Sequence, residues 1–119
     1  MPVRRLLPSP EAEELLALVR QLAERELAPV AAEHERSSVF PRETFSTLGR
    51  AGLLGLPYPQ EVGGGGVAYE VWLQVLEELG ARWASVAVGV SVHALTCFPL
   101  AHFGTSEQQQ RWLPDMLGG

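Results

Sequence analysis

The chain of 119 residues contains no lysine and only one cysteine, Cys97. A single cysteine excludes an internal disulfide and a cysteine-based zinc site, and it favours a cytoplasmic location. A phosphate-binding P-loop ends in Gly-Lys-Ser/Thr, so the four glycines at residues 63–66 predict a tight turn and not a nucleotide site. The nine basic residues are outnumbered by fourteen acids. This balance indicates a solvated acidic surface and excludes a basic nucleic-acid footprint.

Charge is missing altogether from one long stretch, residues 84–103. The stretch approaches the length of a membrane span, but polar residues and a proline interrupt it and no basic clusters flank it, so no span is predicted. Four valines at every second position between residues 86 and 92 alternate with small residues, which is formally a strand pattern. Because no second run of this kind exists to pair with it, we predict a buried helix.

The segments on either side have helical periodicity. Ser9 and Pro10 are typical of a helix start, and Pro29 should kink or interrupt that helix because it lacks an amide hydrogen. A second helix should begin near Pro41 and end at Gly52, in the left-handed conformation that glycine favours. The predicted inward-facing residues of these helices are Leu15, Leu18, Val19, Leu22, Ala23, Leu27, Phe45 and Leu48.

Two more helices complete the prediction. One covers about residues 68–83, and the other follows the capping box formed by Thr105 and Gln108. The predicted inward-facing residues of the first are Tyr69, Trp72, Leu73, Leu76 and Leu79, with Glu70, Gln74, Glu77 and Glu78 mostly outward. The second carries Trp112, Leu113 and Leu117. The sequence therefore predicts one all-α domain over residues 1–119, an orthogonal or up-down bundle of about five helices around a buried central helix at 84–103.

Few side chains are spaced for chemistry. The three histidines are far apart and have no carboxylate or cysteine at metal-ligand spacing, so no metal site is predicted. His93 and Cys97 are four residues apart, but a nucleophile pair on one buried helix is a weak alternative to a hydrogen-bonded core histidine. Glu77 and Glu78 are adjacent and point in different directions, which favours a solvated face over a paired-carboxylate site.

Small residues mark the central stretch at Ala87, Gly89, Ser91 and Ala94. They allow close approach by another backbone or by a ligand. Tight helix packing is the favoured interpretation of the two.

A series of short phrases runs through the chain in a fixed order. They are residues 27–29 (LAP), 40–43 (FPRE), 48–56 (LGRAGLLGL), 59–64 (PQEVGG), 76–79 (LEEL), 84–87 (ASVA), 91–93 (SVH), 103–108 (FGTSEQ) and 110–114 (QRWLP). Together they resemble the N-terminal helical domain of the acyl-CoA dehydrogenase family. One departure is Val62, where the family usually has an aromatic residue before the paired glycines.

The resemblance implies an FAD-dependent oxidoreductase of fatty acid metabolism. Such an enzyme introduces an α,β double bond into acyl-CoA: a glutamate removes the α-proton and the β-hydrogen leaves as hydride to the flavin. It also implies a homo-oligomer, a tetramer or a dimer, with an electron transfer flavoprotein as partner. Flavin monooxygenases, nitroalkane oxidases and enzymes of carrier-protein thioesters share the domain and stay open as alternatives, as does a free-standing helical interaction domain.

In the family, the catalytic glutamate lies in a C-terminal helical domain, and most flavin contacts come from that domain and a middle β-domain. Both domains are expected to be absent from this chain. No catalytic or cofactor-binding residue is therefore assigned, and the isolated chain is expected to be inactive and free of FAD.

What the N-terminal domain contributes in the family is one wall of the acyl-chain pocket, on the helix that matches residues 84–103. The resemblance gives five candidate substrate-binding residues: Val88, Ser91, Val92, Leu95 and Phe98. Positions 88, 91, 92 and 95 share one helical face, as a pocket wall requires, and an apolar wall fits a fatty tail.

Overall fold

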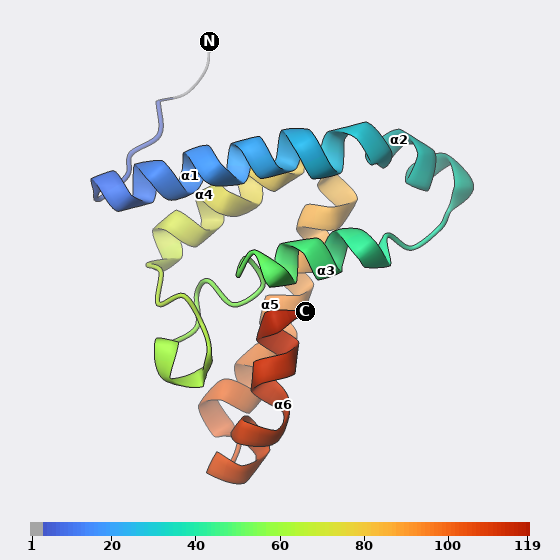
Figure 1. Ribbon diagram of the computed structural model, residues 1–119. Helices are drawn as coiled ribbons and strands as arrows, with labels where there is room; N and C mark the ends of the chain where they lie inside the picture. The colour runs from blue at the N-terminus through green and yellow to red at the C-terminus, as the bar shows by residue number, and fades with distance from the viewer. Residues whose placement is uncertain (1–3) are drawn as a thin grey trace.

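The structure, a computed structural model, describes residues 4–119, and every regular element in that range is helical. Figure 1 shows the arrangement. The elements are α1 (Pro10–Leu22), a π-helical turn (Ala23–Leu27), α2 (Ala28–Ser37), α3 (Arg42–Arg50), a 3-10 turn (Gln60–Val62), α4 (Tyr69–Gly80), α5 (Ala84–Phe103) and α6 (Ser106–Gly118). Because α1, the π turn and α2 form one continuous rod, residues 4–119 hold five helical rods, and the predicted all-α fold is confirmed.

The first rod begins and changes pitch where the sequence predicts. The Ser9 hydroxyl accepts a hydrogen bond from the Ala12 amide, 3.2 Å away, and Pro10 occupies the first turn. The interruption predicted at Pro29 takes the form of the π turn, in which the Ala28 amide donates to the Ala23 carbonyl five residues back. Pro29 then lies in the first turn of α2, where a missing amide hydrogen is tolerated.

The predicted end of α3 at Gly52 is also confirmed. Gly52 adopts φ +80°, and its amide donates to the Gly49 carbonyl at 2.9 Å while the Leu53 amide donates to the Leu48 carbonyl at 3.0 Å. This pair of bonds is a Schellman motif, which satisfies the last carbonyls of the helix. The motif turns the chain toward the core, where Leu53 and Leu54 are buried.

The four-glycine segment is a turn that folds back over the residues before it. The amides of Gly65 and Gly66 donate to the carbonyls of Gly55 and Tyr58 at 2.9 and 2.8 Å. A Cβ atom at Gly64 would lie 2.1 Å from the Tyr58 carbonyl oxygen, so only glycine fits there. The predicted conformational role is confirmed. Since these amides bond to the chain itself, the segment presents no row of free donors to a phosphate group.

The helices form a thin slab. The α1–α2 rod lies across α4, α4 packs on α5, and α6 returns along α5 (Figure 1). The extents are 44 × 38 × 18 Å. Since one helix with its side chains is about 10 Å across, a slab of this thickness is about two helices deep, and no helix is covered on all sides.

The position of α5 shows the effect of this shape. The helix spans the predicted residues, but its buried residues lie on one face only: Val86, Ala87, Val90, Ala94 and Cys97. The prediction that this helix is buried on all sides is therefore wrong, because only one face is buried. By length and composition α5 would also be able to cross a membrane. This is weak evidence for a membrane span, since the core helices of other proteins meet the same test. Here its inner face joins the core with α4 and α6.

The inward faces of α1 and α4 differ from prediction by about one position. Leu18 is 63% exposed, and Leu73 and Tyr69 are also exposed, although all three were predicted to point inward. Val19, Ala23, Leu27, Trp72 and Leu79 are buried as predicted, whereas the burial of Leu16, Val71 and Val75 was not predicted. The buried residues are Ala12, Leu16, Val19, Ala23 and Leu27 in the first rod and Val71, Trp72, Val75, Glu78 and Leu79 in α4.

Candidate functional site

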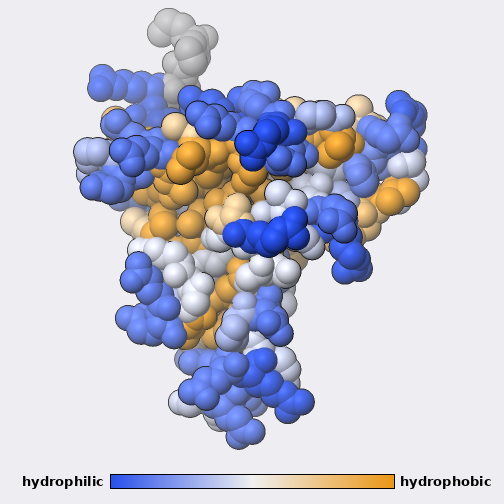
Figure 2. All heavy atoms as spheres, in the orientation of Figure 1, coloured by the Kyte–Doolittle hydropathy of each residue, from blue (hydrophilic) through white to orange (hydrophobic). Residues whose placement is uncertain are grey.

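The outer face of α5 carries all five predicted wall residues, and each of them is exposed. Among the four apolar ones, Leu95 is the most exposed at 70%, and Val88, Val92 and Phe98 follow it. Figure 2 shows that apolar side chains reach the surface on the face in view, with hydrophilic side chains around them. Exposed apolar side chains that gather on one face mark a binding surface.

Three of the five residues, Ser91, Leu95 and Phe98, come together in one groove of about 340 Å³. We call it the Tyr58 groove. Its other walls come from the Pro57–Tyr58 segment and the first turns of α4, so segments distant in sequence build it. The remaining lining residues are Pro57, Tyr58, Tyr69, Trp72, Ala94 and His102.

Tyr58 fixes one wall of this groove. Its hydroxyl donates a hydrogen bond to the Ala94 carbonyl on α5, and its side chain is buried. Burial, with smaller contributions from Cys97 and Tyr69, raises the pKa of Tyr58 to about 12. The segment between α3 and α4 is thereby tied to α5.

The hydroxyl of Tyr58 should have a measurable effect on stability. We expect Tyr58→Phe to lower the free energy of unfolding by about 1 kcal/mol at neutral pH, because one buried hydrogen bond is lost. The phenol's contribution is complete below its unfolded pKa of about 10 and is lost as pH rises through the folded value of about 12. Urea denaturation tests this, with Tyr69→Phe as the control because Tyr69 is exposed. Equal stabilities of Tyr58→Phe and the parent would contradict it.

A second groove, of about 510 Å³, holds Val92 together with Phe45, His93 and Thr96. Gly89, which also lines this groove, lies against the Phe45 ring: a Cβ atom at Gly89 would be 2.6 Å from Phe45 Cζ. Tight packing therefore explains this glycine. Val88 is a lining residue of neither groove. The five predicted residues thus share a face of α5 but divide between two grooves and open surface.

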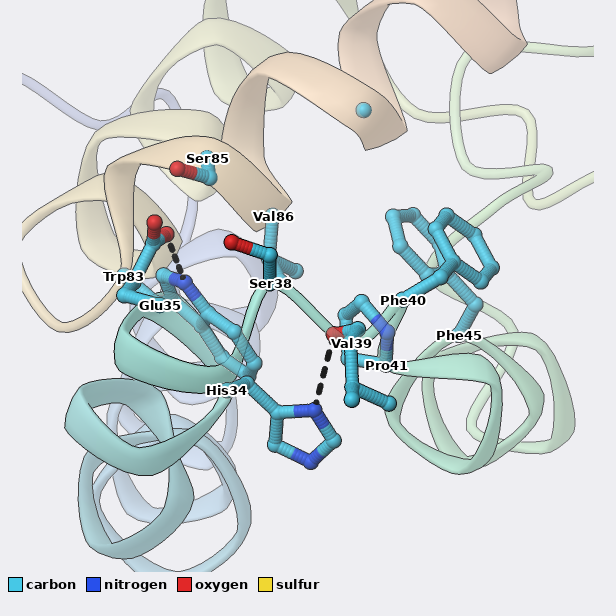
Figure 3. A pocket seen from close by; sticks show the side chains of 11 residues that line it. His34, Glu35, Ser38, Val39, Phe40, Pro41, Phe45, Trp83, Ser85 and Val86 are labelled. Atoms are coloured by element: carbon cyan, nitrogen blue, oxygen red, sulfur yellow. Dashed lines mark hydrogen bonds between the residues drawn. The ribbon is translucent and has the colours of Figure 1, made fainter.

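Sequence reasoning missed a third hollow, of about 450 Å³, between the end of α2 and the start of α5 (Figure 3). The Trp83 indole donates to Glu35 Oε1 at 2.7 Å, and a His34 ring nitrogen lies 3.0 Å from the Val39 carbonyl. Hydrogen bonds from Ser85 and Trp83 lower the pKa of Glu35. The bonds from Trp83 and Ser85 to Glu35 hold α2 to the start of α5.

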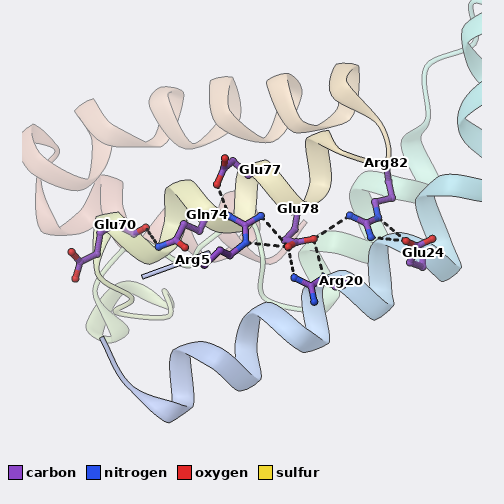
Figure 4. A network of polar contacts seen from close by, with 8 residues as sticks. All are labelled: Arg5, Arg20, Glu24, Glu70, Gln74, Glu77, Glu78 and Arg82. Carbon is purple, nitrogen blue, oxygen red and sulfur yellow. Dashed lines mark hydrogen bonds and ion pairs between the residues drawn. The ribbon is translucent and has the colours of Figure 1, made fainter. Parts of the chain in front are cut away.

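The prediction of a solvated face at Glu78 is wrong. Its carboxylate is buried and accepts hydrogen bonds from Arg5 at 3.0 Å, Arg20 at 2.7 Å and Arg82 at 3.1 Å (Figure 4). The bond from Arg20 lowers the pKa of Glu78 and outweighs burial, which raises it; Arg5 lowers it further. Arg5 also pairs with Glu77. The carboxylate is satisfied by arginines from three segments, which makes it a structural tie.

The described residues, 4–119, also lack the nucleophile pair and the metal cluster considered above. Cys97 is buried, and burial raises the pKa of its thiol, which disfavours the nucleophilic thiolate. His93 Nε2 lies 2.5 Å from the Met116 carbonyl, so its polar contact is with α6. Within residues 4–119 no three metal-ligating side chains gather. The same range offers no fit for a flavin phosphate at the glycine segment, whose amides bond to the chain itself.

Residues 9–119 match the family model described as "Acyl-CoA dehydrogenase, N-terminal domain". The chain belongs to the acyl-CoA dehydrogenase family. The short-chain specific acyl-CoA dehydrogenase of Rattus norvegicus mitochondria is 35% identical over 112 residues, which cover 92% of this chain and 27% of the relative. The acryloyl-CoA reductase (NADH) of Anaerotignum propionicum is 37% identical over 109 residues, with 92% of this chain and 28% of the relative covered.

The crystal structure of glutaryl-CoA dehydrogenase from Mycobacterium smegmatis superposes with a TM-score of 0.87 at 30% identity. The match covers 94% of this acyl-CoA dehydrogenase domain and 29% of that chain. The domain thus spans about a quarter to a third of the length of these relatives, and it corresponds to their N-terminal helical part.

Proposed function

We propose that this domain forms one wall of the acyl-chain pocket of an enzyme that catalyses the α,β-dehydrogenation of acyl-CoA. One observation carries the proposal: the outer face of α5 exposes the apolar side chains of Val88, Val92, Leu95 and Phe98, and the last two line the Tyr58 groove. Burying apolar surface is favourable at about 25 cal/mol per Å², so a hydrocarbon tail laid on this face is stabilised without any charged partner. The family match supports the choice of acyl-CoA as ligand.

Roles within the wall follow from contact. Leu95 and Phe98 present apolar surface to the tail, and Ser91 and His102 are the polar side chains of α5 that line the groove. No residue of the described range is assigned to proton abstraction. Acyl-CoA dehydrogenases are in general flavoproteins, and FAD supplies the oxidising chemistry when bound; the proposal places its site in parts of the relatives to which this chain does not align.

The proposal extends to the surroundings of the complete enzyme. It includes a cytoplasmic location, a homodimer or homotetramer and an electron transfer flavoprotein as the electron acceptor. Family membership supports these partners.

Activity of the protein expressed from its complete reading frame tests the function. We expect a visible flavin absorbance band that is bleached by acyl-CoA, and dye reduction that depends on acyl-CoA. The 119-residue chain is the control and should show neither. A protein from the complete frame that turns over no acyl-CoA would contradict the proposal, and a flavin band in the 119-residue chain would contradict the placement of the cofactor.

Filling the groove tests the wall itself. We expect Ser91→Trp to lower kcat/KM for octanoyl-CoA about ten-fold, since an indole in the groove displaces the tail, while butyryl-CoA loses less. Ser106→Trp is the matched control because Ser106 is exposed at the start of α6, outside the groove. Equal losses in the two variants, or no loss in Ser91→Trp, would remove Ser91 from the wall.

A further inference from the structure

The lining of the Tyr58 groove has an unusual composition. Five of its nine residues carry aromatic rings, namely Tyr58, Tyr69, Trp72, Phe98 and His102. Aliphatic side chains, which suffice to hold a saturated tail, contribute little more than Leu95. The rings come from the segment before the glycine turn, from α4 and from α5, so their convergence is a product of the fold.

Four of these five rings are held in place. Tyr58 is tied by its hydroxyl to α5, and Trp72 is fully buried. Phe98 and His102 stack with centroids 4.0 Å apart, and His102 Nδ1 lies 3.1 Å from the Phe98 carbonyl. Tyr69 is exposed at the first turn of α4. A ligand in the groove therefore meets walls that lose little conformational freedom when it binds.

One unpaired ring, that of Tyr69, is open to a ligand in this groove. Tyr69 is 66% exposed, and within residues 4–119 its ring pairs with no other ring, although aromatic side chains favour stacked or edge-to-face partners. Tyr58 and Trp72 also pair with no other ring in this range, but both are buried. The groove that holds Val92 differs, because its two phenyl rings, Phe40 and Phe45, already stack on each other at 5.2 Å.

We infer that the Tyr58 groove selects acyl groups that end in an aromatic ring, such as 3-phenylpropanoyl-CoA, over saturated tails of similar size. The inference rests on the proposed function and names its substrate class. An aryl ring gains aromatic pairing in addition to the apolar area that it buries, whereas a saturated chain gains the area alone. The volume of about 340 Å³ accommodates a phenyl ring on a short linker.

The test compares kcat/KM for 3-phenylpropanoyl-CoA and octanoyl-CoA in the protein from the complete reading frame. We expect the aryl substrate to be preferred, and Phe98→Leu and Tyr69→Leu each to lower the ratio of the two values about five-fold. Both side chains are exposed, so the variants should fold. Phe40→Leu is the matched control, because Phe40 is an exposed phenylalanine outside the Tyr58 groove, and its ratio should equal that of the parent.

The possible results distinguish failure of the inference from failure of the proposed function. Turnover of octanoyl-CoA without preference for the aryl thioester would overturn the inference and leave the proposed function intact. A ratio unchanged in both Phe98→Leu and Tyr69→Leu, or lowered only in Phe40→Leu, would overturn the assignment to this groove. Absence of turnover with both thioesters would overturn the proposed function, and the inference with it.

Discussion

Replacing Glu78 with Gln is expected to lower the free energy of unfolding by about 2 to 3 kcal/mol at neutral pH. The Glu78 side chain is 4% exposed, and its charge is the common partner of Arg5, Arg20 and Arg82. An amide keeps the shape but not the charge, and its NH₂ group faces donors. Removing one partner of a fully buried pair costs about 3 to 5 kcal/mol; the value is smaller here because the arginines are partly exposed to water.

Glu77→Gln is the matched control. Glu77 is adjacent, also pairs with Arg5, and is 68% exposed, so its replacement should change stability by less than about 0.5 kcal/mol. Urea denaturation of the 119-residue chain measures both. Equal effects in the two variants would show that the burial of Glu78 does not determine its contribution to stability.

The Glu78 prediction includes a dependence on pH. The folded-state pKa of Glu78 lies below its usual value of 4.5, so its stabilising contribution is complete above that value and is lost as pH falls through the lower, folded value. The stability difference between the parent chain and Glu78→Gln should therefore narrow as the solution is acidified below about pH 4.5. A difference that grows with acid would contradict the sign of the shift.

Gly64→Ala is expected to destabilise the chain by about 3 kcal/mol or more. An added Cβ would lie 2.1 Å from the Tyr58 carbonyl oxygen and 2.7 Å from that of Gly55. Both carbonyls are backbone groups that accept hydrogen bonds from the glycine turn, so neither is able to move without loss of those bonds. Thermal and urea unfolding measure the change.

Gly80→Ala is the control for this substitution. A Cβ at Gly80 meets only Ala87 Cβ, at the ordinary contact distance of 3.5 Å. Because alanine favours helix over glycine by up to about 1 kcal/mol, Gly80→Ala should be neutral or stabilising. A Gly64→Ala chain as stable as the parent would mean that the turn has room to rearrange.

Helix limits were largely predictable because their causes are local. Ser9, Gly52 and the Thr105–Gln108 capping box act through bonds to residues at most a few positions away, and all three are present in the structure. The lack of a pairing partner identified α5 as a helix. Such signals need no knowledge of how the helices are arranged.

Burial was harder to predict because it depends on tertiary arrangement. The uniform hydropathy of α5 does not reveal that the domain is only 18 Å thick, so it predicted burial on every side. Glu78 shows a related error: in sequence it is one acid among several, and the arginines that make its burial tolerable are up to 73 positions away. No local pattern carries that information.

The candidate site was predicted in part. Family resemblance predicted the face of α5 on which the proposal rests, but not the division of its residues between two grooves. The opposing rings of Tyr58 and Tyr69 come from other segments, and Tyr69 was predicted to face the core. The aromatic lining became visible only once those segments were placed against α5.

The π turn between α1 and α2 has a consequence for changes in chain length. It holds one residue more than a regular turn, so deleting one of its residues would leave an ordinary α-helical turn and keep the residues beyond it close to their present orientation. His34 and Glu35 would then still meet Trp83 at the start of α5. A deletion inside α1 would instead rotate everything beyond it by about 100°, so the first rod tolerates the loss of a residue better at the π turn than in α1.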